Sequence, residues 1–106
     1  MPDLRVESVP DQPDVGAITV RLSGEIDVAN ATALTDSLEA VSEPGRRLVL
    51  DMANVSFIDS SGVNVLLRAA GWAGDRHGGL TIGDASANVR KILEILGLTE
   101  HFGLPG

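Results

Sequence analysis

Apolar and polar residues alternate most clearly in residues 17–23, where Ile18, Val20 and Leu22 share one side of an extended chain. This period of two predicts a strand with one buried face. Residues 4–9 alternate more weakly and predict an edge strand. The segment between them, residues 10–16, is rich in Pro, Asp and Gly and predicts a loop, so the two strands are expected to pair as a hairpin.

Two later segments predict strands of a different kind. Residues 48–50 read Leu-Val-Leu without any alternation, which is typical of a central strand covered on both faces. Residues 80–82, Leu-Thr-Ile, predict a further short strand.

Residues 24–28 are expected to form a loop, after which apolar residues recur at the helical spacing of three and four. Asn30 is a suitable N-cap for this first helix, and Pro44-Gly45 ends it. Its expected inner stripe consists of Ala31, Leu34, Leu38 and Val41.

Two more helices follow from the same spacing. One is predicted for residues 61–75, with Val65 and Trp72 at the border of its polar stripe. Its expected inner face consists of Val63, Leu66, Leu67, Ala70 and Ala73. The other begins after Ser86 as N-cap and ends at Gly97. Its expected inner residues are Val89, Ile92, Leu93 and Leu96.

The predicted order is therefore β-β-α-β-α-β-α. Strands separated by helices imply right-handed crossovers, so we expect an α/β fold with a mixed, mostly parallel sheet and helices packed on it. We expect one domain over residues 1–106, with an ordered core at residues 3–98 and a tail at residues 99–106.

Composition and charge narrow the possible functions. The chain has no cysteine, which excludes disulfides and thiolate chemistry and is compatible with the cytoplasm. It has no apolar run long enough to span a membrane. The net charge of -7 and the scarcity of aromatic residues argue against direct binding of nucleic acid. The same charge favours a monomer.

The candidate functional residues are Asp59-Ser60-Ser61-Gly62, which lie between a strand and the second helix. These small polar residues are typical of a helix N-cap, and that role alone would explain them. Free N–H groups and the helix dipole also make such a turn a good place for a phosphate, so an anion site or a phosphorylated serine is the functional interpretation. Phosphate on Ser60 would gain from the helix and be repelled by Asp59, so the fold should tolerate it.

Other chemistries lack the residues they need. A nucleophilic Ser60 would require a base, and His77 and His101 are expected to be solvated surface residues. The chain has no G-x-S-x-G elbow, phosphate-binding loop, calcium loop or zinc site, so we expect no catalytic residues, cofactor or metal. Trp72 remains open between a core residue and an anchor for a partner.

The order of elements and three motifs resemble the STAS domain family, and within it the bacterial anti-sigma factor antagonists. The motifs are Gly-Glu-Ile-Asp at 24–27, Leu-Val-Leu-Asp at 48–51 and Val-Ser-Phe-Ile-Asp-Ser-Ser-Gly-Val at 55–63. The resemblance implies partner switching. An unphosphorylated antagonist binds an anti-sigma factor with serine kinase activity and frees the sigma factor. Phosphorylation releases the antagonist, and a serine phosphatase resets it.

The resemblance also implies roles for particular residues. Ser60 is the phosphoacceptor, with Asp27, Asp59 and Ser61 flanking it, and Gly62 is the small residue that lets the turn form next to a partner. The partner-binding residues are assigned to the helix that follows: Asn64, Val65, Arg68 and Trp72. The alternative is a STAS accessory subunit of a membrane transporter that is not switched by phosphorylation; co-purification with an ATPase would favour it.

Overall fold

The computed structural model describes residues 4–9, 16–76 and 78–104. The loop expected at residues 10–16 lies mostly outside this range, as do His77 and the last two residues. The predicted order of elements is confirmed. The elements are β1 (Arg5–Ser8), β2 (Ala17–Ile26), α1 (Ala31–Val41), β3 (Arg47–Ile58), α2 (Ser60–Arg76), β4 (Leu80–Ala85) and α3 (Ala87–Ile95).

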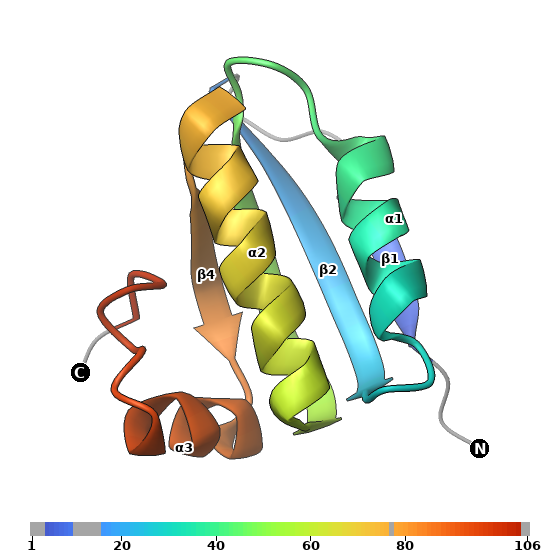
Figure 1. Ribbon diagram of the computed structural model, residues 1–106, viewed down its shortest axis with the longest axis vertical. Helices are drawn as coiled ribbons and strands as arrows, with labels where there is room; N and C mark the ends of the chain where they lie inside the picture. The colour runs from blue at the N-terminus through green and yellow to red at the C-terminus, as the bar shows by residue number, and fades with distance from the viewer. Residues whose placement is uncertain (1–3, 10–15, 77, 105–106) are drawn as a thin grey trace.

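The strands form one four-stranded mixed sheet in the order β1-β2-β3-β4. β1 and β2 pair antiparallel, as expected for the opening hairpin, and the β2–β3 and β3–β4 pairs are parallel. The parallel pairs are joined through α1 and α2. Because both crossovers advance in the same direction across the sheet, right-handed connections place both helices on one face, as Figure 1 shows.

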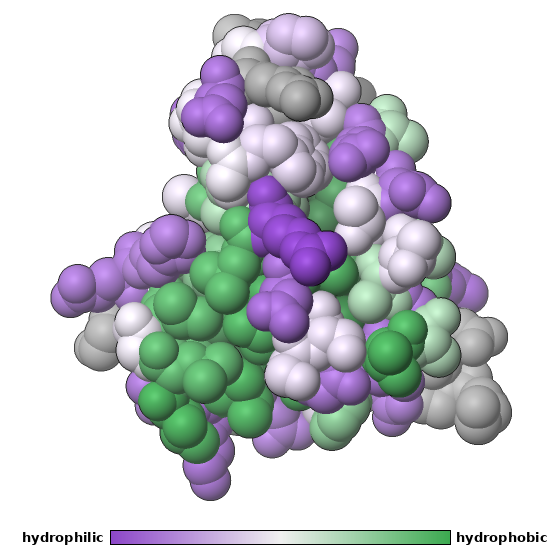
Figure 2. Space-filling model, in the orientation of Figure 1, coloured by the Kyte–Doolittle hydropathy of each residue, from purple (hydrophilic) through white to green (hydrophobic). Residues whose placement is uncertain are grey.

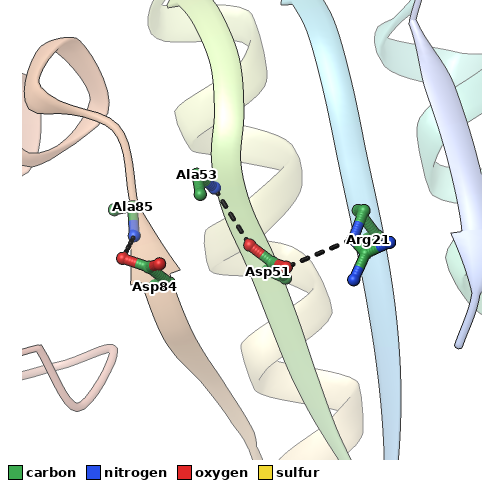
Figure 3. A network of polar contacts seen from close by, with 5 residues as sticks. All are labelled: Arg21, Asp51, Ala53, Asp84 and Ala85. Atoms are coloured by element: carbon green, nitrogen blue, oxygen red, sulfur yellow. Dashed lines mark hydrogen bonds and ion pairs between the residues drawn. The ribbon is translucent and has the colours of Figure 1, made fainter.

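The opposite face of the sheet carries polar and charged residues, which corrects the expectation that residues 48–50 are covered on both faces. Leu48 and Leu50 are fully buried beneath the helices, but Val49 between them is only partly buried. On the open face the Arg21 Nε lies 3.3 Å from the Asp51 Oδ2, across the strand pair. Figure 3 shows this ion pair with α2 behind the strands. Both crossover helices, α1 and α2, lie on the other face of the sheet (Figure 1).

β3 is much longer than predicted, because two irregularities break its alternation. The offset between paired residues shifts between Arg21 and Ser23, and again between Gly24 and Glu25. At each shift β3 contains one more residue than the paired part of β2. The side chains of β3 after the extra residue therefore point to the opposite face from the one that simple alternation predicts. Val55 and Ile58 both turn inward as a result. β2 is longer too, and continues through Ile26 where a loop was expected.

The third helix confirms Ser86 as an N-cap, since its Oγ accepts a hydrogen bond from the Val89 N–H at 3.3 Å. Val89 and Leu93 are buried as predicted, but Leu96 is 53% exposed. The prediction for Leu96 is wrong although its backbone is still helical and its N–H donates to the Ile92 carbonyl at 3.1 Å. The core does not extend beneath the last turn of the helix, where Ile95 is exposed as well. Gly97 then adopts φ 70°, as the expected C-terminal glycine.

Residues 99–104 belong to the core, which corrects their assignment to a tail. Phe102 is fully buried and Leu104 is 4% exposed. The Phe102 carbonyl accepts a hydrogen bond from the Ile82 N–H at 2.8 Å, so this segment also covers part of the outer edge of β4. No described helix combines the length and apolar character needed to cross a membrane.

Candidate functional site

The predicted turn lies where β3 ends and α2 begins, and Asp59 is its N-cap. The Asp59 Oδ1 accepts a hydrogen bond from the Gly62 N–H at 3.1 Å, and its carbonyl accepts the first helical bond, from the Val63 N–H at 3.0 Å. The helix therefore begins at Ser60, one residue earlier than predicted. Because a carboxylate performs the capping, neither serine hydroxyl is needed for it.

Ser60 is the first residue of α2 and is exposed, whereas Ser61 is partly buried. The first N–H groups of a helix have no acceptor within it, so the backbone of this turn presents donors and the positive end of the helix dipole to solvent. Among the described residues, no hydrogen bond engages the Ser60 hydroxyl. Its oxygen is therefore available to an incoming group.

Gly62 is buried, so its small size serves this chain's own packing. A Cβ built on Gly62 would lie 2.6 Å from the Ile26 Cγ2 and 2.7 Å from the Ile58 Cγ1. These two side chains end the neighbouring strands β2 and β3, whose last residues pair in register. The missing side chain lets α2 start directly against the ends of both strands. Gly62 is thus a small residue required by the packing beneath the turn, and its expected place next to a partner stays a prediction.

Asp27 lies beside the turn because β2 and β3 are parallel and end together. Ile26 pairs with Ile58, and the Ile26 carbonyl accepts a hydrogen bond from the Asp59 N–H at 3.2 Å. Asp27 and Asp59 therefore follow directly after the ends of two adjacent strands. The Asp27 Oδ1 accepts a hydrogen bond from the Ala29 N–H at 3.0 Å, which holds the carboxylate within its own loop.

Asn30 organises that loop instead of capping the helix by its side chain, which corrects its expected role. Its Oδ1 accepts from the Asp27 N–H at 3.0 Å, and its Nδ2 donates to the Glu25 carbonyl at 2.8 Å. Asn30 does occupy the N-cap position of α1, but its side chain makes no capping hydrogen bond to the helix. The loop after β2 is thus fixed from within, next to Ser60.

One side of the turn borders a polar groove between the two long helices, which we call the α1–α2 groove. Its volume is about 250 Å³. It contains three of the four residues assigned to partner binding, namely Asn64, Val65 and Arg68, of which Val65 is 7% exposed. The other lining residues are Val28, Ala31, Thr32, Thr35 and Ser61. Val28, at 76% exposure, is the one large apolar side chain at its border that is freely accessible.

Trp72 does not line the α1–α2 groove. It is partly buried and lies twelve residues after Ser60 in the same helix, which corresponds to about 18 Å along the axis. The structure therefore brings Asp27, Asp59, Ser60 and Ser61 together, with Asn64 and Arg68 within about 12 Å of Ser60, and leaves Trp72 apart.

The other side of the turn borders an apolar groove between the end of β3 and α3, which we call the β3–α3 groove. Its volume is about 310 Å³. It is lined by residues 56–58 of β3 and by Asn88, Lys91, Ile92 and Ile95 of α3. Sequence reasoning did not assign these residues to a site. Counting alternate positions from Leu50 places Phe57 outward, but it also places Asn54 and Ser56 inward, so the pattern gave no dependable signal.

Two observations concern the residue types that metal binding or catalysis would require. Within the described ranges no group of three or more His, Cys, Asp or Glu residues could hold a metal ion. His101 packs edge-on against Phe102, with ring centroids 5.0 Å apart, and no hydrogen bond connects it to Ser60. What the arrangement offers is an exposed hydroxyl, two carboxylates and a groove on each side.

Comparison with known proteins identifies the family. The family model described as "Mlab, STAS domain" matches residues 11–105. The chain belongs to the STAS domain family.

Individual relatives agree with this assignment. The chain is 31% identical to a STAS-domain containing protein of Pseudomonas aeruginosa over 80% of this chain and 84% of that protein. It is 30% identical to the anti-sigma-B factor antagonist of Bacillus subtilis over 78% of this chain and 76% of that protein. Among solved structures, an anti-sigma factor antagonist from Mycobacterium paratuberculosis superposes with a TM-score of 0.80 at 26% identity, covering 96% of this chain and 85% of that one. The resemblance to the anti-sigma factor antagonists is confirmed.

Proposed function

We propose that this protein is an anti-sigma factor antagonist switched by phosphorylation of Ser60. In the unphosphorylated form it binds an anti-sigma factor with serine kinase activity and so frees a sigma factor. A serine phosphatase restores this form after phosphorylation. The observation that carries the proposal is the position of Ser60, which is exposed at the start of α2 with its hydroxyl released from capping by Asp59.

The proposed chemistry takes place in the kinase. The Ser60 Oγ attacks the γ-phosphorus of ATP, the new O–P bond forms as the bond to the ADP oxygen breaks, and the hydroxyl proton passes to a base of the kinase. The antagonist contributes only the acceptor oxygen and the backbone that presents it. It needs no catalytic residue, cofactor or metal of its own, and we place its action in the cytoplasm.

The release step follows from charge at an interface. A phosphoserine adds close to two negative charges at neutral pH, here beside the carboxylates of Asp27 and Asp59. Removing such a group from water is costly unless cations of the partner pair with it. A surface that fits a neutral hydroxyl therefore loses affinity without any change in the antagonist's shape.

We propose that the partner surface is centred on this turn. Asp27, Asp59 and Ser61 flank the acceptor. Asn64 and Arg68 extend the surface along the α1–α2 groove, and Val65, at 7% exposure, forms part of the groove's floor. Gly62 acts from below by allowing α2 to start where it does. We leave Trp72 outside this surface, because about 18 Å of helix separates it from Ser60.

The experiment is a phosphorylation assay. The purified protein is incubated with ATP and a panel of serine-kinase anti-sigma factors encoded in the same genome, and the modified residue is mapped by mass spectrometry. We expect phosphate on Ser60 that is lost in Ser60→Ala and retained in Ser61→Ala, the matched control. In binding measurements Ser60→Ala should bind constitutively and Ser60→Asp should not bind.

Two results would contradict the proposal. Phosphate on Ser61 in place of Ser60 would move the acceptor. No phosphorylation by any kinase of the panel, together with a transporter ATPase that co-purifies equally with wild type and with Ser60→Asp, would instead support the unswitched transporter subunit.

A further inference from the structure

The β3–α3 groove is a built feature of the fold. Three hydrogen bonds hold the start of α3 against β3: the Ser86 Oγ donates to the Val55 carbonyl at 2.6 Å, the Ser86 N–H to the Met52 carbonyl at 3.1 Å, and the Asn88 Nδ2 to the Ser56 carbonyl at 2.9 Å. The groove between these elements is therefore formed before any partner arrives. A preformed groove reduces the entropy lost on binding.

Large apolar side chains remain exposed around this groove. Phe57 is 47% exposed and Ile95 is 70% exposed. Figure 2 shows apolar side chains gathered over α3, at the lower left of the view. Large exposed apolar side chains that gather in one region mark a site of interaction with another molecule.

The groove lies close to Ser60. Ile58, which lines it, precedes Ser60 by two residues, so their Cα atoms are at most about 8 Å apart. A standard protein interface covers roughly 800 Å² on each partner, which corresponds to a disc of about 16 Å radius. The whole domain measures 31 × 30 × 22 Å. A partner that covers Ser60 with an interface of this size therefore extends over at least one of the two grooves.

The composition of the two grooves indicates which of them contributes most of the binding free energy. The α1–α2 groove is lined mainly by small or polar side chains, including Thr32, Thr35 and Asn64. The β3–α3 groove offers an exposed phenylalanine and an exposed isoleucine. Apolar and aromatic residues form the energetic centre of interfaces, whereas polar residues form the rim.

We propose that the anti-sigma factor inserts an apolar segment into the β3–α3 groove, with Phe57 and Ile95 as its main contacts. The inference rests on the proposed function and adds the location of the binding energy. Lys91 lines the same groove as a cation on a chain of net charge -7. The inserted segment should therefore carry a carboxylate beside its apolar residues, facing Lys91.

The test measures by isothermal titration calorimetry how tightly variants at two neighbouring residues, Ile95 and Leu96 at the end of α3, bind the anti-sigma factor. The probe is the anti-sigma factor that phosphorylates Ser60, with ADP in place of ATP so that no phosphoryl transfer occurs. Ile95→Gln should raise the Kd about tenfold or more, which is the effect of losing an interface hot spot. Leu96→Gln is the matched control, because Leu96 is 53% exposed yet does not line the groove; its Kd should stay within about twofold of wild type. Phe57→Ser provides a second groove variant, and thermal unfolding verifies that each variant is folded.

The outcomes separate this inference from the proposed function. If Ser60→Asp abolishes binding while Ile95→Gln and Phe57→Ser bind like wild type, the groove inference is wrong and the switch stands. Equal weakening by Ile95→Gln and Leu96→Gln also overturns the groove inference. If no anti-sigma factor phosphorylates or binds the wild type, both fail. Sedimentation equilibrium tests whether a second copy of the chain occupies the groove instead. If the wild type self-associates and Ile95→Gln abolishes this self-association, the groove binds a second copy and the inference is wrong.

Discussion

At the carboxyl ends of β2 and β3, the side chains that face the core differ from those that face solvent in how well they tolerate substitution. We call these the inner and the outer side of this edge. On the inner side Ile26, Ile58 and Gly62 are packed so closely that one added methyl group would lie within 2.7 Å of two side chains. On the outer side Phe57 and Ser60 face solvent. The two sides alternate within six consecutive residues of the chain, so neighbours in sequence serve opposite purposes.

This difference separates stability from recognition. The inner side determines where α2 starts and therefore where Ser60 lies, while the outer side supplies the groups a partner meets. We expect inner-side substitutions to lower the free energy of unfolding with little effect on the affinity of the folded molecules. Outer-side substitutions should do the reverse. Substitutions on the two sides test this division, and the largest change in stability is expected on the inner side.

Ile26→Ala should have the largest effect. Ile26 is fully buried at the end of β2, and truncating such a side chain costs about 2–5 kcal/mol because a cavity remains. Ile26→Val, the milder control, should cost about 0.5–1.5 kcal/mol. Urea unfolding followed by circular dichroism measures both. A cost below that of Ile26→Val would show that the inner side repacks freely.

Gly62→Ala should cost about 1–3 kcal/mol, because its Cβ overpacks against Ile26 and Ile58. Gly71→Ala in the same helix is the matched control, since nothing lies within 4 Å of the added carbon. It should stabilise the protein by roughly 0.4–1 kcal/mol, since alanine favours the helix and restricts the unfolded chain. In the Ile26→Ala background, Gly62→Ala should cost less than in the wild type. Additive costs would mean that the two residues are not in contact.

Asp59→Ala should cost about 1 kcal/mol, because the Gly62 N–H loses its capping acceptor. Asp59→Asn keeps a capping oxygen and should remain within a few tenths of a kcal/mol of wild type. Urea titration measures the free energy of unfolding of both variants. Their difference separates the contribution of the capping hydrogen bond from that of the negative charge. Equal losses for both variants would show that the charge at this position, and not the hydrogen bond, stabilises the helix.

Much of the fold could be predicted from periodicity. The alternation of Ile18, Val20 and Leu22 and the helical spacing of Leu34 and Leu38 identified buried faces correctly. The order of elements followed from them. Where strands end could not be predicted in this way, because the shifts in register within β2 and β3 arise from pairing between distant segments. The inward turn of Val55 depends on such a shift.

Residues near the chain's end show a second limit. Phe102 lies in a segment without regular periodicity, so nothing local distinguishes it from a tail. It is fully buried because a hydrogen bond from Ile82 ties the segment to the edge of β4. Leu96 shows the converse: its spacing fits the inner stripe of α3, but the core does not extend beneath the last turn of the helix, so Leu96 is exposed.

The turn that contains Ser60 could be predicted from the sequence, but the β3–α3 groove beside it could not. The motif around Ser60 is contiguous in sequence, and parallel strands that end together bring Asp27 to it. The β3–α3 groove combines Phe57 with Ile95, thirty-eight residues apart in the sequence, and only tertiary packing brings them together. Trp72 was assigned to partner binding as one of few aromatic residues. Its separation of about 18 Å from Ser60 follows from the fact that α2 runs without a break between the two residues.

Ser60→Asp should have the smallest effect on stability, within about 0.5 kcal/mol of wild type. A carboxylate at the first position of a helix gains about 0.3–1 kcal/mol from the dipole, and the adjacent carboxylate of Asp59 opposes that gain. The side chain is exposed, so no buried contact is lost. Ser61→Asp is the contrasting variant, because Ser61 is partly buried in the α1–α2 groove and a charge there should cost more. Both free energies of unfolding come from urea titration at low and high salt. If Ser60→Asp unfolded as easily as Ile26→Ala, loss of binding by that variant would reflect loss of the fold, and the division between the two sides of the edge would fail.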